Sequence, residues 1–144
     1  MKKGKIYQIL IFCFALGGFL DASYLVYKHY QGGLVICAVF NGCDTVLNSS
    51  YALVWGVPVA LLGAGFYFTV LVFSLFILSG WEELKKPIFL LSMVGVLTSL
   101  YFLYLQIFVI KEFCFYCLIS VFATVGIFIF SLFLLKRKKQ GNIV

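Results

Sequence analysis

Charge is scarce in this sequence, and negative charge most of all. Only 11% of the residues are charged, with five aspartate and glutamate residues against eleven lysine and arginine residues, and there are one histidine and two prolines. A chain of 144 residues with so little polar surface cannot cover a soluble domain. The sequence also has no serine–histidine–acid set, phosphate-binding glycine loop or repeat. What remains is 64% hydrophobic, with a mean hydropathy of +1.11, and is predicted to lie in a membrane.

Four uninterrupted apolar stretches are present, and each is long enough to cross a hydrocarbon core about 30 Å thick. They cover about residues 6–27, 57–79, 87–110 and 114–135. The first is long for a signal peptide and lacks a clean small-x-small cleavage site. Little chain remains outside these spans, so we expect a single domain over residues 1–144. The predicted fold is an all-α, four-helix transmembrane bundle.

Lysine and arginine are distributed unevenly around the four spans. Three lysines precede the first span, Lys85 and Lys86 lie between the second and third, and four basic residues follow the fourth, whereas Lys28 and Lys111 fall on the other side. By the positive-inside rule both termini are predicted to be cytoplasmic, with the loop of residues 28–56 at the outer face. The net charge of +6 is then a signal of topology and does not indicate nucleic-acid binding.

The predicted topology brings four of the five cysteines to the outer face. Cys37 and Cys43 fall in the outer loop, and Cys114 and Cys117 open the fourth span. The outer face is the oxidising one, where disulfides persist. A C-x-x-C pair in the first turn of a helix lies near the positive end of the helix dipole, which favours a thiolate and reversible disulfide chemistry. Cys13, deeper in the first span, is expected to be a buried packing residue.

The outer loop is nearly as apolar as the spans, so we expect it to lie on the bundle as a lid. A short amphipathic helix is predicted from Thr45 to Val54, parallel to the membrane plane, with Asp44 as its N-cap. Within the first span, Asp21 is a candidate for polar or proton-handling function, because an acid is costly at that depth. The alternative is that it finds a local structural partner. Gln106, near the outer end of the third span, is a second polar candidate.

The four outer cysteines leave three functions open. A thiol–disulfide relay needs one pair reachable from solvent and one pair fixed beside the terminal acceptor, and the loop pair and the C-x-x-C pair meet this need. A bundle interior in a chain with 19% aromatic residues can provide an apolar quinone pocket, and no metal is required. The alternatives are a tetrathiolate metal-binding membrane protein and a structural membrane protein stapled by two disulfides.

An ordered set of motifs resembles the vitamin K epoxide reductase family. Four motifs carry this resemblance along the chain: Cys37-x5-Cys43, Cys43-Asp-Thr-Val-Leu-Asn-Ser49, Trp55-Gly56 and Cys114-x2-Cys117. The resemblance implies a four-helix transmembrane bundle around a quinone, ubiquinone or menaquinone, covered by a loop disulfide. It also implies the activity of the bacterial members, which oxidise a thioredoxin-like periplasmic protein and pass the electrons to the quinone, supporting disulfide-bond formation.

The resemblance also implies a role for each cysteine. Cys37 would exchange disulfides with the partner protein, Cys43 would attack Cys114, and Cys117 would be released as a thiolate against the quinone ring. Ser49 matches a serine that the family uses beside the quinone or the relay cysteines.

Two positions depart from the vertebrate members of that family. Ala52 and Val121 stand at positions where those enzymes have a quinone-contacting asparagine and tyrosine, which argues against vitamin K epoxide reduction. Ser120 is instead similar to bacterial members. Those members often carry a fused thioredoxin-like domain, and this sequence has none, so the expected partner is a separate DsbA-like extracytoplasmic protein. The expected location is the inner, or plasma, membrane of the cell.

Overall fold

The structure, a computed structural model, describes residues 2–32 and 42–141. Four long helices carry the fold: α1 (Lys2–Gln31), α3 (Val59–Leu78), α4 (Lys85–Tyr104) and α5 (Phe115–Gly141). The shorter elements are α2 (Cys43–Leu47), the 3₁₀ turns η1 (Ser50–Ala52) and η2 (Glu82–Leu84), the strands β1 (Leu53–Val54) and β2 (Val57–Pro58), and the π-helical segment η3 (Leu105–Ile110). All four long helices, with η2 and η3 extending α4, are long and apolar enough to cross a membrane, which confirms the predicted helical membrane bundle.

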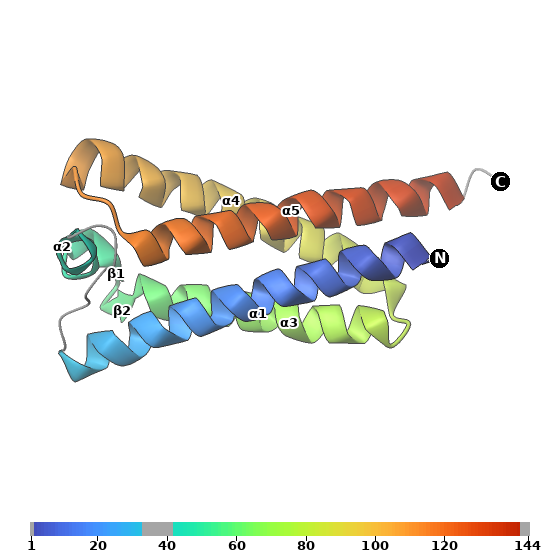
Figure 1. The fold of residues 1–144 in the computed structure, drawn as a ribbon, viewed down its shortest axis with the longest axis horizontal. Coiled ribbons are helices and arrows are strands. Elements are labelled where there is room, and N and C mark those ends of the chain that lie inside the picture. Colours follow the sequence, from blue (N-terminus) through green and yellow to red (C-terminus); the bar gives the residue numbers. More distant parts are fainter. Residues whose placement is uncertain (1, 33–41, 142–144) are drawn as a thin grey trace.

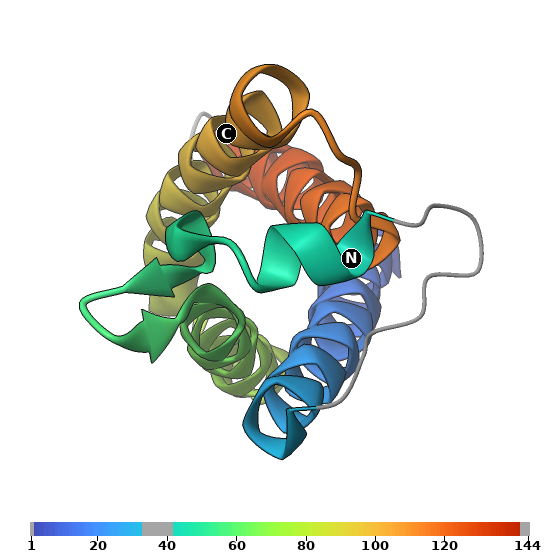
Figure 2. The same cartoon turned by 90° about the vertical axis from the view of Figure 1, so that its left-hand side faces the viewer.

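The long helices run side by side and form a bundle (Figure 1). α1 packs against α3 and α5, and α5 also packs against α4. Seen end on, the four long helices are arranged around the axis of the bundle, and α2 lies across the end of the bundle (Figure 2). The start of α1 and the end of α5 lie at one end of the bundle, and α2 and the strands lie at the other (Figure 1). We call residues 42–58 the lid.

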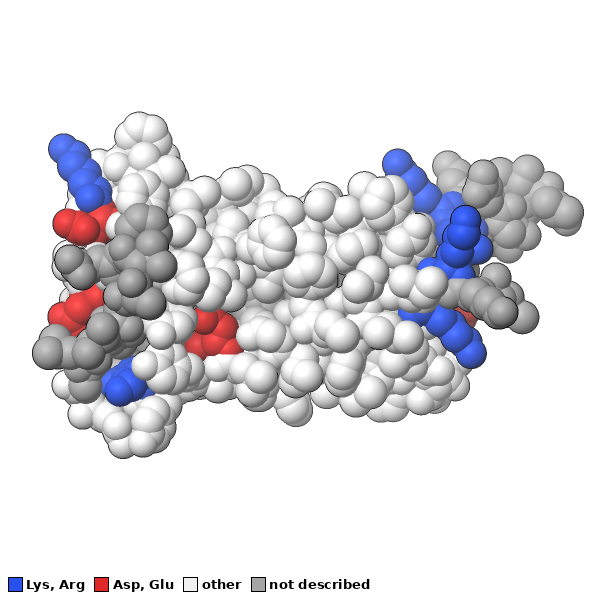
Figure 3. All heavy atoms as spheres, viewed as in Figure 1, with Lys and Arg blue, Asp and Glu red and all other residues white. Residues whose placement is uncertain are grey.

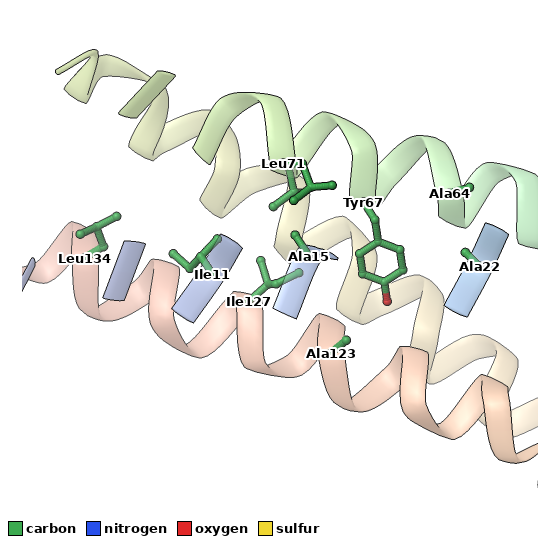
Figure 4. Packing of buried hydrophobic residues seen from close by; sticks show 10 residues of the cluster. Ile11, Ala15, Ala22, Ala64, Tyr67, Leu71, Ala123, Ile127 and Leu134 are labelled. Atoms are coloured by element: carbon green, nitrogen blue, oxygen red, sulfur yellow. The ribbon is translucent and has the colours of Figure 1, made fainter. Parts of the chain in front are cut away.

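Close packing in the middle of the bundle depends on small residues that face aromatic rings. Ala15 and Ala22 of α1 are buried, and a Cβ on Gly18 would overlap the ring of Tyr67. Tyr67 points from α3 across the interior towards α5 (Figure 4). In lipid, helices gain little from hydrophobic burial against one another, so this interlocking of small residues and rings supplies much of the stability.

The lid differs from the single amphipathic helix predicted from Thr45 to Val54. α2 already ends at Leu47, where Ser49 Oγ donates to the Val46 carbonyl at 2.7 Å and so satisfies a group of the last turn. Asn48 Nδ2 also donates to Asp44 Oδ1 at 2.8 Å. The N-cap position is occupied by Gly42 and not by Asp44, which lies in the first turn. The prediction of one continuous helix was therefore wrong.

After η1 the chain forms a two-residue β-hairpin in which Leu53 pairs with Pro58 and Val54 with Val57. Trp55 and Gly56 form its turn, and both have positive φ values, 52° and 78°. Positive φ at both central positions is the requirement of a type I′ turn, whose twist suits a tight hairpin. The side chain of Trp55 is fully exposed at the tip.

Cys13 also differs from expectation, because it is exposed on the outside of the bundle. The buried face of α1 is marked by Ile11 and Ala15, which are one turn apart. Cys13 lies midway between them in sequence and therefore on the opposite side of the helix. Its thiol faces the surroundings of the bundle and takes no part in the core.

Candidate active site

A cavity of about 420 Å³ lies between the lid and the middle of the bundle. Every long helix contributes to its wall, and Val46, Leu47 and Ala52 of the lid close it at one end. The lining is mostly aliphatic and aromatic, with few polar groups. The size and the mixture of an apolar wall with scattered polar atoms are typical of a pocket for a mostly apolar small molecule.

The C-x-x-C pair lies at the start of α5, beside this cavity. Cys114 is the N-cap of the helix: its carbonyl accepts from Leu118 N–H at 3.1 Å, and its Sγ accepts from Cys117 N–H at 3.4 Å. The hydrogen bond from the Cys117 thiol, together with the backbone N–H groups of Cys117 and Tyr116, lowers the pKa of Cys114, although burial opposes this shift. Cys114 and Cys117 are both free thiols. A thiolate at Cys114 is thus favoured by the helix start itself.

Gln106, at the end of the third membrane-crossing helix, holds the start of α5 in place. It is only 2% exposed, and its Oε1 accepts a hydrogen bond from the backbone N–H of Cys114 at 3.2 Å. The carboxamide also hydrogen-bonds the thiol of Cys117. Gln106 lies in the π-helical segment η3, whose wider turn changes the direction of the side chains that follow Tyr104, and Lys111 then ends the helix with a left-handed φ of 58°. This irregular end of the third span brings a polar side chain to both cysteines.

Cys43 meets the C-x-x-C pair from the lid. It is fully buried, and it belongs with Cys114 to one apolar cluster that also contains Leu25 and Val46. Cys43 is disulfide-bonded, whereas Cys37 lies outside the described residues. The lid therefore holds a disulfide sulfur close to the start of α5.

Gly42 allows this close approach of the lid. A Cβ at this position would lie 2.7 Å from Glu112 Oε2 and 2.8 Å from the carbonyl oxygen of Phe113, in the connector that leads to Cys114. The carbonyl cannot move without displacing the start of α5. Any side chain at residue 42 must therefore push the lid away from the connector.

We expect Gly42→Ala to slow thiol exchange between Cys43 and Cys114 by about tenfold or more, because a displacement of about 1 Å between reacting groups can lower a rate by about 10²-fold. The rate of cross-link formation between the two cysteines, followed by peptide mapping under non-reducing conditions, measures this effect. Gly65→Ala is the matched control, because a Cβ there meets no atom within 4 Å. An exchange rate in Gly42→Ala equal to that of the control would contradict the proposed contact.

The inner end of the cavity is closed by Tyr67, which is 1% exposed. Its hydroxyl donates to the Ser120 carbonyl at 2.7 Å and lies 2.8 Å from both Ser120 Oγ and Thr124 Oγ1. These bonds tie α3 to α5 across the bundle. Beyond Tyr67 the interior is filled by Val70, Leu71 and Ile127.

The structure brings most of the candidate residues together around one cavity. Its wall includes seven of them: Asp21, Ser49, Ala52, Gln106, Cys117, Ser120 and Val121. Cys114 lies just behind this wall and Cys37 is outside the described residues. Sequence reasoning missed Tyr67 and Phe66, because one aromatic residue in a long apolar run has no distinguishing signal. It also gave no role in the cavity to His29, which lines the wall.

The model of the vitamin K epoxide reductase family matches residues 9–132. This chain belongs to that family. Family membership agrees with four membrane-crossing helices and with cysteines gathered at one end of the bundle.

A characterised relative is the thiol-disulfide oxidoreductase LTO1 of Arabidopsis thaliana, which is 32% identical over 134 residues. The alignment covers 87% of this chain and 36% of that protein, so the chain spans about a third of the relative's length.

Proposed function

We propose that the protein is a membrane thiol–disulfide oxidoreductase that takes electrons from a dithiol protein and passes them to a quinone. The observation that carries this proposal is the burial of Cys43 and Cys114 in one apolar cluster, beside a cavity that Cys117 lines. Each step of a relay is an attack of one sulfur on another, so two cysteine pairs need such a meeting point. The name of the Arabidopsis relative and the family membership support the same class of reaction.

The relay consists of exchanges in which one S–S bond forms as another breaks. A thiolate of the partner opens a Cys37–Cys43 disulfide at Cys37, and the partner's second thiol then releases Cys37. Cys43 attacks Cys114 of an oxidised C-x-x-C pair and frees Cys117, and Cys37 attacks Cys43 to restore the loop disulfide. Two electrons then reside on the thiols of Cys114 and Cys117. A disulfide-bonded Cys43 beside two free thiols, as observed, corresponds to the end of this sequence.

The cavity residues fit a quinone as the acceptor. A mostly apolar wall suits the ring and its tail, while Cys117, Gln106 and Ser120 offer polar contacts. Ser49 and Ala52 of the lid and Val121 of α5 would hold the ring from the sides. A bound ubiquinone or menaquinone would supply an acceptor of two electrons and two protons.

We further propose a single domain over residues 1–144 in a plasma membrane, with the lid on the outer side and both termini in the cytoplasm. Lysine and arginine side chains gather at the end of the bundle opposite the lid (Figure 3), which is the distribution expected for that orientation. The dithiol partner is then an extracytoplasmic protein of the thioredoxin fold, resembling DsbA, because disulfides persist in the oxidising space outside the cytoplasm.

Two alternatives are less well supported. A tetrathiolate metal site needs four free thiolates, but Cys43 is disulfide-bonded. A structural protein stapled by two disulfides would leave no free thiols among the four outer cysteines, whereas Cys114 and Cys117 are both free.

The test uses purified protein in lipid nanodiscs with a soluble quinone analogue and a reduced thioredoxin-fold protein. We expect quinone to be consumed in equal amount to the dithiol oxidised. A partner variant that keeps only the cysteine that attacks Cys37 is then expected to be trapped in a mixed disulfide with Cys37, because the second partner thiol that would release Cys37 is missing. If neither quinone consumption nor a trapped partner is found with active donor and acceptor, the proposed function is wrong.

A further inference from the structure

Asp21 has a buried carboxylate oxygen without a partner. The residue lies in α1, ten positions before its end at Gln31, and lines the cavity. Within residues 2–32 and 42–141, Oδ2 is buried and makes no hydrogen bond. A buried polar atom without a partner is destabilising and is uncommon in folded proteins. A ligand bound in the cavity could supply the missing hydrogen-bond partner of this atom.

No neighbouring group in the described chain neutralises this carboxyl group. Four titratable groups lie close enough to interact with it electrostatically: Tyr67 of α3, and Cys114, Tyr116 and Cys117 at the start of α5. The hydroxyl of Tyr67 is already bonded to Ser120 and Thr124. None of these groups is a cation, and the ion pair between Lys85 and Glu82 involves other residues.

When an acid lies in an apolar cavity without a cation beside it, the neutral carboxyl group has a lower free energy than the carboxylate. The neutral form carries an O–H donor, which most of the cavity wall lacks. A ligand carbonyl oxygen facing Asp21 would therefore find one of the few donors available to it. Among the described residues that line the cavity, Asp21 is the only acid, so the role falls on this residue.

We propose that Asp21 is the proton donor of the cavity: its carboxyl group hydrogen-bonds a carbonyl oxygen of the electron-accepting ring and protonates that oxygen as the ring is reduced. This inference rests on the proposed function and assigns a catalytic residue to it. Asp21 gives up one proton and regains one of the two protons released when Cys114 and Cys117 form their disulfide. The pair loses two electrons and two protons, and reduction of the quinone to the hydroquinone takes up the same number.

The test compares wild-type protein, Asp21→Asn and Asp21→Glu in lipid nanodiscs. Asp21→Asn keeps the size and polarity of the side chain and cannot release a proton, so quinone turnover is expected to fall about 100-fold or more, the usual contribution of a general acid. Cross-linking of Cys43 to Cys114 without quinone should proceed at the wild-type rate, because that step uses no proton from Asp21. Asp21→Glu should retain most of the turnover. Glu82→Gln, the same chemical change at the opposite end of the bundle, is the control.

Infrared difference spectroscopy gives a readout besides turnover. We expect a carbonyl stretch of a protonated carboxyl group that shifts when quinone is added to the wild-type protein and is absent from Asp21→Asn. Unchanged turnover in Asp21→Asn, or equal losses in Asp21→Asn and Asp21→Glu with both proteins folded, would overturn the assignment of Asp21. Absence of quinone turnover in the wild-type protein would instead refute the proposed function, and the assignment with it.

Discussion

Replacement of Cys117 by alanine is expected to abolish quinone reduction and to leave Cys43 and Cys114 joined in a mixed disulfide. Cys114 and Cys43 lie in the same buried cluster, so exchange between them does not need Cys117. Without Cys117 no Cys114–Cys117 disulfide can form to accept electrons or pass them to the quinone, so Cys114 can only attack Cys43 of the loop disulfide, which displaces Cys37 and leaves the Cys43–Cys114 pair. Alanine keeps the backbone N–H that bonds Cys114 Sγ, but it removes the thiol that contributes most to lowering the pKa of Cys114.

Turnover should fall by at least about 10³-fold, as for loss of an essential nucleophile. Peptide mapping under non-reducing conditions should recover the Cys43–Cys114 pair from Cys117→Ala and none from Cys114→Ala. Cys13→Ala is the control and should retain wild-type turnover, since Cys13 is exposed on the outside of the bundle. Turnover in Cys117→Ala above a tenth of the wild-type value would exclude Cys117 as the last sulfur of the relay.

The four membrane-crossing helices could be predicted from the sequence because hydropathy alone determines them. A backbone in lipid must satisfy its own hydrogen bonds, so each long apolar run has one outcome. The position of Cys114 at the start of a helix could be predicted as well, since the apolar run resumes at that point. Asp21 and Gln106 were predicted as candidates because polar residues are conspicuous in such runs.

Other features depend on contacts that no local pattern specifies. Whether a cysteine in an all-apolar helix faces the core or the lipid depends on the rotation of the helix about its axis. Nearly every neighbour of Cys13 is apolar, so no local pattern indicated that this residue faces outward. The π-helical segment that aims Gln106 at the cysteines arises where α4 meets the connector to α5. α2 ends at Leu47 where the Ser49 hydroxyl bonds the Val46 carbonyl, a side-chain hydrogen bond that competes with helix continuation.

Tyr67 is the clearest of these cases, and its replacement should have the largest effect on stability. Tyr67→Ala is expected to lower the free energy of unfolding by about 3–5 kcal/mol, the usual loss when a packed aromatic side chain leaves a hole. The ring fills the space over Gly18 and separates the cavity from Val70 and Leu71. Thermal unfolding in detergent, monitored by circular dichroism, measures the change.

Tyr67→Phe separates the ring from its hydroxyl. Thr124 Oγ1 donates to the Ser120 carbonyl at 2.8 Å without help from Tyr67, so loss of the tyrosine hydroxyl leaves that carbonyl satisfied. The expected loss is therefore only about 1 kcal/mol, that of one neutral hydrogen bond. Equal destabilisation by Tyr67→Phe and Tyr67→Ala would mean that the hydroxyl network, and not the ring, holds α3 to α5.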